Sequence, residues 1–154
     1  MADMFLDKFR SLVPEYLDDK WQPEDGLSED ELEEMVQDSL GRPAAVLPQA
    51  VREFYLSVGG VEDLMEAYYF VWEPDEFEIE DGYLLFMEDE EEKFVWGIRE
   101  DQLSVPDPLV HRRNNATGRW MSEDGTFSEY MLDMYSWVFE ELEPELEDQP
   151  ESQG

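Results

Sequence analysis

The stretch from residue 83 to residue 139 decides the fold, because it holds four runs of β-branched and aromatic residues and then a helix signal. Turn residues separate the four runs, which is the pattern of antiparallel strands. The segment after Thr126 is apolar on almost every side, so we expect it to form a helix buried against the sheet. The four runs are Tyr83-Leu84-Leu85-Phe86-Met87, Lys93-Phe94-Val95-Trp96-Gly97-Ile98, Leu109-Val110-His111-Arg112 and Arg119-Trp120-Met121.

The N-terminal part of the chain predicts two helices separated by a loop. Apolar residues at helical spacing indicate a short amphipathic helix that ends before Pro14, with a loop over 14–27. Ser28 and Glu31 have the spacing of a capping box, in which the two side chains accept hydrogen bonds from each other's backbone N–H groups. We therefore expect a second helix from Ser28 that Gly41 ends.

The middle of the chain predicts a third helix and two short strands before the central stretch. The segment 47–60 has Pro48 where a first helical turn tolerates it, and Gly59-Gly60 can supply a left-handed residue at the helix end. Residues 67–72 form a strand candidate. Residues 77–80 alternate apolar and acidic side chains, which is typical of a half-buried edge strand.

Two turns and one cap complete the expected fold. Asp81-Gly82 predicts a tight hairpin turn, and the acidic run 89–92 joins the two strongest strands. Thr126 with Glu129 forms a second capping box at the start of the last helix. We expect an α+β fold of one domain, in which a mostly antiparallel or mixed sheet of about five to six strands packs against several α-helices.

Composition supports one domain and predicts an acidic tail. The chain has 154 residues, of which 42% are hydrophobic and 14% aromatic, enough to build a core. Beyond Glu140 the sequence turns to Glu, Pro, Asp, Gln and Ser. We therefore expect residues 1–142 to form the domain and residues 143–154 to be a disordered tail.

The net charge of −32, from 42 acidic and 10 basic residues, limits the possible partners. Such a field repels nucleic acid and anionic membrane surfaces and speeds encounter with basic proteins. Solubility or adaptation to salt is the alternative explanation. The chain has no cysteine, no signal peptide and no apolar run long enough to span a bilayer, so we expect a cytoplasmic protein.

No residue pattern indicates catalysis, a cofactor or a metal. His111 is the only histidine and lies in an expected strand without a nearby ligand or nucleophile motif. The run 89–92 lacks the alternation of a calcium loop, and nucleotide-binding glycine motifs are absent from the sequence. Four arginines form a small basic island that we interpret as counter-charges to neighbouring carboxylates: Arg99, Arg112, Arg113 and Arg119.

The order of these features resembles the SUKH superfamily, the Smi/Knr-like immunity proteins that protect bacteria from polymorphic toxins. The resemblance spans residues 28–140. It implies a mixed sheet packed against helices, no catalytic residues, and binding that blocks a toxin domain, often a nuclease. It rests on the Leu-Pro-led helix ending in Gly59-Gly60, the strand Phe94-Val95-Trp96-Gly97-Ile98, the run Asp107-Pro108-Leu109-Val110-His111, and the helix opening Thr126-Phe127-Ser128-Glu129-Tyr130-Met131-Leu132. Phe54, Trp96, Pro108 and Phe127 would then be fold determinants.

An acidic surface with aromatic anchors is the predicted partner-binding site. A row of carboxylates can occupy a basic cleft that is built to attract phosphates. The predicted set is Trp72, Glu73, Asp75, Glu76, Phe77, Glu78, Glu80, Asp81, Glu88, Asp89, Glu90, Glu91 and Glu92.

The first interpretation is a non-enzymatic protein that neutralises a cognate, basic toxin domain, with no nucleic-acid or membrane partner. The alternative is a regulatory or scaffolding domain of the same fold that binds another basic protein. A metal-dependent hydrolase that uses the carboxylates is a third class. The sequence leaves open a monomer or a weak homodimer paired through the 77–79 edge.

Overall fold

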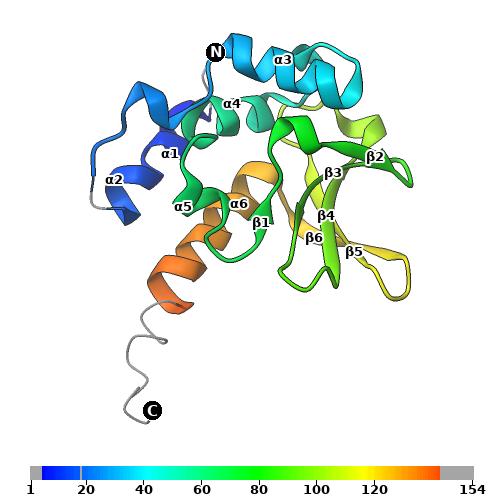
Figure 1. The fold of residues 1–154 in the computed structure, drawn as a ribbon. Helices are drawn as coiled ribbons and strands as arrows, with labels where there is room; N and C mark the ends of the chain where they lie inside the picture. The colour runs from blue at the N-terminus through cyan, green and yellow to red at the C-terminus, as the bar shows by residue number, and fades with distance from the viewer. Residues whose placement is uncertain (1–4, 18, 143–154) are drawn as a thin grey trace.

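The strands form one antiparallel sheet in the order β1-β3-β4-β5-β6, and β2 also pairs with β3 (Figure 1). This computed structural model describes residues 5–17 and 19–142, so the expected tail over 143–154 lies outside the described residues. The predicted α+β class is confirmed. The strands are β1 Phe70–Val71, β2 Glu78–Glu80, β3 Tyr83–Glu88, β4 Phe94–Arg99, β5 Leu109–Asn114 and β6 Arg119–Thr126.

Tight turns set the register of the β2–β3 and β3–β4 hairpins. Asp81 and Gly82 both have positive φ, 58° and 82°, which is the backbone of a two-residue type I′ turn, and Glu80 pairs with Tyr83 across it. The run 89–92 closes the β3–β4 hairpin. Both turns are those the sequence predicts.

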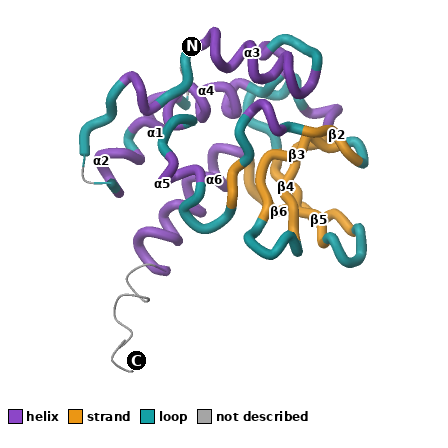
Figure 2. Tube along the Cα trace, in the orientation of Figure 1, coloured by secondary structure: helices purple, strands orange, loops and turns teal. Residues whose placement is uncertain are grey.

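The helices gather on one side of the sheet, where α4 and α6 pack together (Figures 1 and 2). Ser28 caps α3 and Thr126 caps α6 through the predicted capping boxes, and Gly41 ends α3 with φ 67°. The helices are α1 Leu6–Arg10, α2 Leu12–Tyr16, α3 Glu29–Leu40, α4 Gln49–Val58, α5 Glu62–Met65 and α6 Phe127–Ser136, which continues as a π-helix over Trp137–Leu142.

Aromatic side chains join the helices to the sheet in the core. The Phe54 ring on α4 lies edge-to-face against Phe9 of α1, with centroids 5.2 Å apart, and against Phe127 of α6 at 5.8 Å. Phe127 also packs 5.2 Å from Phe86 on β3. All four side chains are almost fully buried, and burial of each contributes about 2–3 kcal/mol. This cluster fixes α4 and α6 relative to the sheet.

Two expectations about proline and glycine are wrong. Pro14 lies inside α2 because it occupies the first turn, where its missing N–H needs no acceptor, and the helix breaks earlier, at Ser11. Gly59 ends α4 with an ordinary φ of −61°. Glycine is needed at positions 59 and 60 because a side chain would not fit. A Cβ on Gly59 would lie 2.6 Å from the Tyr55 carbonyl oxygen, and a Cβ on Gly60 would lie 2.9 Å from the Glu24 carbonyl oxygen.

Candidate partner-binding site

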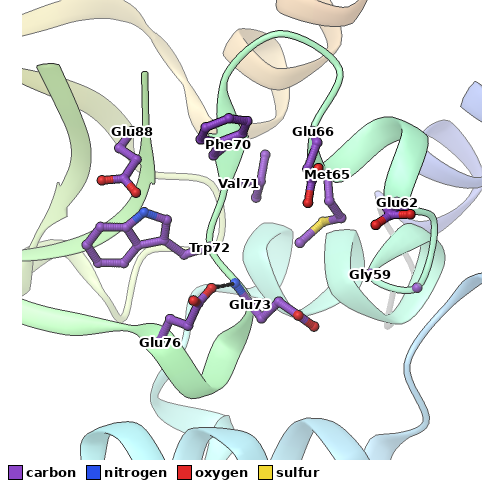
Figure 3. Close-up of a pocket in the computed structure, with 11 residues that line it drawn as sticks. Gly59, Glu62, Met65, Glu66, Phe70, Val71, Trp72, Glu73, Glu76 and Glu88 are labelled. Atoms are coloured by element: carbon purple, nitrogen blue, oxygen red, sulfur yellow. Dashed lines mark hydrogen bonds between the residues drawn. The ribbon is translucent and has the colours of Figure 1, made fainter. Parts of the chain in front are cut away.

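A pocket of about 440 Å³ opens between α5, β1 and the β3 edge, and carboxylates surround it (Figure 3). Met65, Phe70 and Trp72 supply apolar wall. The described residues that line it include no lysine, arginine or histidine. We call it the acidic pocket, and its carboxylates are Glu62, Glu66, Glu73, Glu76 and Glu88.

Pairing of β1 with β3 brings the aromatic and acidic parts of the pocket together. Phe70 lies opposite Glu88 in the antiparallel register. The Trp72 backbone is held from two sides: its N–H donates to the Phe86 carbonyl at 2.7 Å, and its carbonyl accepts the Tyr55 hydroxyl at 2.6 Å. The position of Trp72 is therefore fixed by both the sheet and α4.

The remaining carboxylates come from two short helical turns. Glu73 precedes the 3₁₀ turn Pro74–Glu76, and the Glu76 carboxylate accepts the Glu73 backbone N–H at 2.9 Å. Glu62 and Glu66 belong to α5 and its end, directly after the close turn at Gly59-Gly60. Acidic side chains in a first helical turn are stabilised by the helix dipole, which suits Glu62 at this place.

The carboxylates of the acidic pocket repel one another. Partial burial, followed by the charges of Asp75 and Glu76, raises the pKa of Glu73. Burial is also the main cause that raises the pKa of Glu88, and a hydrogen bond from the Trp72 side chain opposes that shift. Among the described residues, no ion pair joins a lysine or arginine to any carboxylate of this pocket. The arrangement is chemically suited to receive a cation.

The structure brings together only part of the predicted acidic set. Trp72, Glu73, Glu76 and Glu88 line the acidic pocket, and Asp75 is exposed in the same 3₁₀ turn. Phe77 does not serve as an exposed anchor, because its ring is 1% exposed and packs 5.6 Å from the Tyr55 ring in the core. Phe77 therefore points into the core, immediately before β2 begins at Glu78.

Two predicted carboxylates form internal ion pairs at the opposite end of β3. The Arg113 guanidinium donates to Glu80 and, at 3.0 Å, to Asp81. The Trp120 ring stacks on Tyr83 there, with centroids 3.7 Å apart. Glu78 is exposed on β2. This group is distinct from the acidic pocket, and Arg113 is the counter-charge that the basic island predicts.

The run 89–92 has a structural role at its first residue. The Asp89 carboxylate accepts the backbone N–H groups of Lys93 at 2.6 Å and Phe94 at 3.1 Å, which closes the hairpin turn. Glu91 forms an exposed ion pair with Lys93 at 2.8 Å. Glu90 and Glu92 are exposed, the latter with φ 57°.

Seven pocket residues lie outside the predicted set: Gly59, Gly60, Glu62, Met65, Glu66, Phe70 and Val71. Among them, Glu62, Met65 and Glu66 belong to α5 and its end, a helix too short to show a period. The available signal was the acidic Glu62-Asp63 pair immediately after Gly59-Gly60, which is typical of a helix start.

The His111 side chain lies on β5 beside an aromatic ring. Its ring is half-buried on β5, 5.5 Å from the Tyr83 ring, and Nδ1 has no hydrogen-bond partner among the described residues. Burial, helped by the Arg99 charge, lowers its pKa, so the ring is neutral at pH 7. Within 5–17 and 19–142, no group of three or more His, Asp or Glu side chains is placed to hold a metal ion.

In the described part of the chain, no helix has the length and apolar character needed to cross a bilayer. Searches against protein-family models, curated proteins and solved structures found no match to this chain.

Proposed function

We propose that the protein binds a basic protein domain through the acidic pocket and blocks that domain's function, as an immunity protein of the SUKH type blocks its toxin. One observation carries the proposal: five glutamates surround one pocket, and no cation of the described chain neutralises them. Two of these groups are costly to ionise in the free protein, because partial burial and neighbouring carboxylates raise the pKa of Glu73 and Glu88. A bound lysine or arginine removes that cost.

The proposed mechanism is occupation of a basic groove. The field of the whole chain, with a net charge of −32, steers a basic domain toward this protein before contact. At contact the glutamates take the place of substrate phosphates, and Trp72 and Phe70 supply apolar area. The proposal is therefore non-catalytic inhibition, and it predicts a salt-dependent association rate.

The first test is a calorimetric titration against the C-terminal domain of the toxin candidate encoded beside this gene. We expect one-to-one binding with a nanomolar Kd and loss of the toxin's activity at equivalence. Tight binding without loss of activity would favour the scaffolding alternative. No binding at about 50 mM salt, where exposed charges are weakly screened, would contradict this partner assignment.

A further inference from the structure

Three large aromatic side chains are exposed beside the acidic pocket, and two of them are in ring contact. Tyr68 is 45% exposed, and Phe70 and Trp137 are each 37% exposed. The Tyr68 and Trp137 rings meet edge-to-face, with centroids 5.2 Å apart, although they come from opposite halves of the chain. Phe70 stands at the rim of the acidic pocket between Glu66 and Glu88 (Figure 3). We call these three residues the aromatic ridge.

The Tyr68 and Trp137 part of the ridge rests on the core through Tyr69. The Tyr69 ring lies 4.8 Å from Tyr68 on one side and 4.4 Å from Trp96 on the other. Trp96 is 1% exposed, and its indole N–H donates to Glu123 at 2.7 Å. Trp137 opens a π-helical segment, an uncommon geometry that is frequent at functional sites. Rigid aromatic side chains of this kind lose little entropy when a partner covers them.

Charge determines which partner can cover the ridge. The acidic pocket lies on one side, with Glu66 and Glu88 beside Phe70. On the other side, Tyr68 lines a second hollow in which acidic residues outnumber basic ones: Asp89, Glu90 and Glu91 against Lys93 and Arg112. A second copy of this chain seated on the ridge would bring like-charged carboxylates together, so self-association there is unfavourable. A partner with basic residues around an apolar recess is complementary.

We propose that the aromatic ridge enters an apolar recess of the partner, while lysine or arginine side chains at the rim of that recess reach the acidic pocket. This inference rests on the proposed function and adds the chemistry of the partner's surface. It makes the ridge the source of affinity and the glutamates the source of steering and salt dependence.

Three short capped peptides test the inference without a known partner. Their sequences are Arg-Leu-Leu-Arg, Arg-Gly-Gly-Arg and Gln-Leu-Leu-Gln, and binding is followed by NMR through the indole N–H signals of Trp72 and Trp137. We expect Arg-Leu-Leu-Arg to bind about fivefold or more tightly than Arg-Gly-Gly-Arg, which corresponds to one apolar contact worth about 1 kcal/mol. Gln-Leu-Leu-Gln should bind most weakly.

Each other outcome has a distinct meaning. Equal binding of the two arginine peptides, with shifts confined to Trp72, would overturn the inference and leave the proposed function standing. Equal binding of the leucine peptides with and without arginine would overturn the electrostatic basis of the proposed function. The absence of shifts with all three peptides at millimolar concentration would overturn both.

Variants of the full chain test whether the aromatic ridge causes the tighter binding of Arg-Leu-Leu-Arg. Tyr68→Ser should reduce the affinity for Arg-Leu-Leu-Arg to that of Arg-Gly-Gly-Arg, and Trp137→Ser provides a second, independent removal of the ridge. Leu109→Ser is the matched control, because Leu109 is 44% exposed and lies on β5, away from the pocket. Unchanged peptide affinity in folded Tyr68→Ser and Trp137→Ser, shown by their circular dichroism, would contradict the inference.

Discussion

The glutamates around the acidic pocket illustrate how single residues can favour binding at the expense of stability. Burial and neighbouring charges raise the pKa of Glu73 and Glu88, so the folded protein holds their protons more tightly than the unfolded chain. Their ionised forms therefore weaken the folded state. This is the behaviour expected of a surface that a cationic partner later covers.

The first prediction concerns the pH dependence of stability. Stability should fall as pH rises from the ordinary glutamate pKa to the raised values of Glu73 and Glu88, because the unfolded chain releases its protons first. The double variant Glu73→Gln/Glu88→Gln should therefore have a Tm about 1–3 °C higher than the wild type at pH 7. The difference should disappear below about pH 3, where both groups are protonated in the folded and the unfolded state.

Differential scanning calorimetry across this pH range makes the measurement. Glu15→Gln/Glu34→Gln is the control, because both residues are exposed and lie outside the acidic pocket. A double pocket variant that is less stable than the wild type at pH 7 would show that these carboxylates stabilise the fold, which contradicts this explanation.

The second prediction concerns the close approach of two backbone segments at Gly26. A Cβ on Gly26 would lie 1.7 Å from the Leu56 carbonyl oxygen, and the neighbouring Leu27 N–H donates to the Tyr55 carbonyl at 3.0 Å. Gly26→Ala must therefore push the 23–27 segment away from α4, and it should lower the free energy of unfolding by about 2–3 kcal/mol. Gly125→Ala is the control, since its Cβ would meet nothing nearer than 3.9 Å. Equal stability of the two variants in urea denaturation would contradict this packing.

At the scale of elements, the hairpins and capped helices form from local signals. Asp81-Gly82 supplies two positive φ angles, and the capping boxes at Ser28 and Thr126 satisfy the first N–H groups of α3 and α6. The β3–β4 turn uses a different device, the carboxylate of Asp89.

The third prediction concerns the contribution of Asp89 to the stability of the acidic turn. Asp89→Ala removes the acceptor of two backbone N–H groups and should cost about 1–2 kcal/mol in the free energy of unfolding, whereas Asp89→Asn should retain most of the stability. Glu90→Ala should be neutral, because Glu90 is exposed. Urea denaturation of the three variants makes the comparison. An Asp89→Ala variant as stable as Glu90→Ala would show that the turn does not depend on this carboxylate.

Local patterns predicted the elements better than the site. The hairpin turns, the two capping boxes and the long strands follow from short-range chemistry, so they were correctly placed. The strand expected over 67–72 contracts to Phe70–Val71, because only these residues pair with β3. Phe77 was assigned to the surface because alternation shows two faces without showing which one is buried. The acidic pocket was only partly predicted, since Glu62 and Glu88 line one pocket only because α5 and β1 pack beside β3.

At the scale of the whole molecule, the acidic surface is divided into parts with different roles. Glu80 and Asp81 form ion pairs with Arg113. In the β3–β4 turn, the Asp89 carboxylate accepts a backbone N–H of the same turn. The acidic pocket and the aromatic ridge remain as a charged and apolar surface on adjoining elements, α5, β1 and the end of α6. A general requirement for solubility predicts no such localisation, because every exposed carboxylate would then contribute alike.

The most direct test compares two triple variants with the same change in net charge for binding the candidate toxin domain by calorimetry. The pocket variant is Glu62→Gln/Glu66→Gln/Glu88→Gln. The control variant is Glu15→Gln/Asp30→Asn/Glu34→Gln, which neutralises exposed carboxylates on α2 and α3 outside the pocket. We expect the pocket variant to lose about tenfold or more in affinity, with a weaker salt dependence, and the control to stay within about twofold of the wild type. Equal losses in the two variants would show that only the overall charge matters and would contradict the assignment of binding to the acidic pocket.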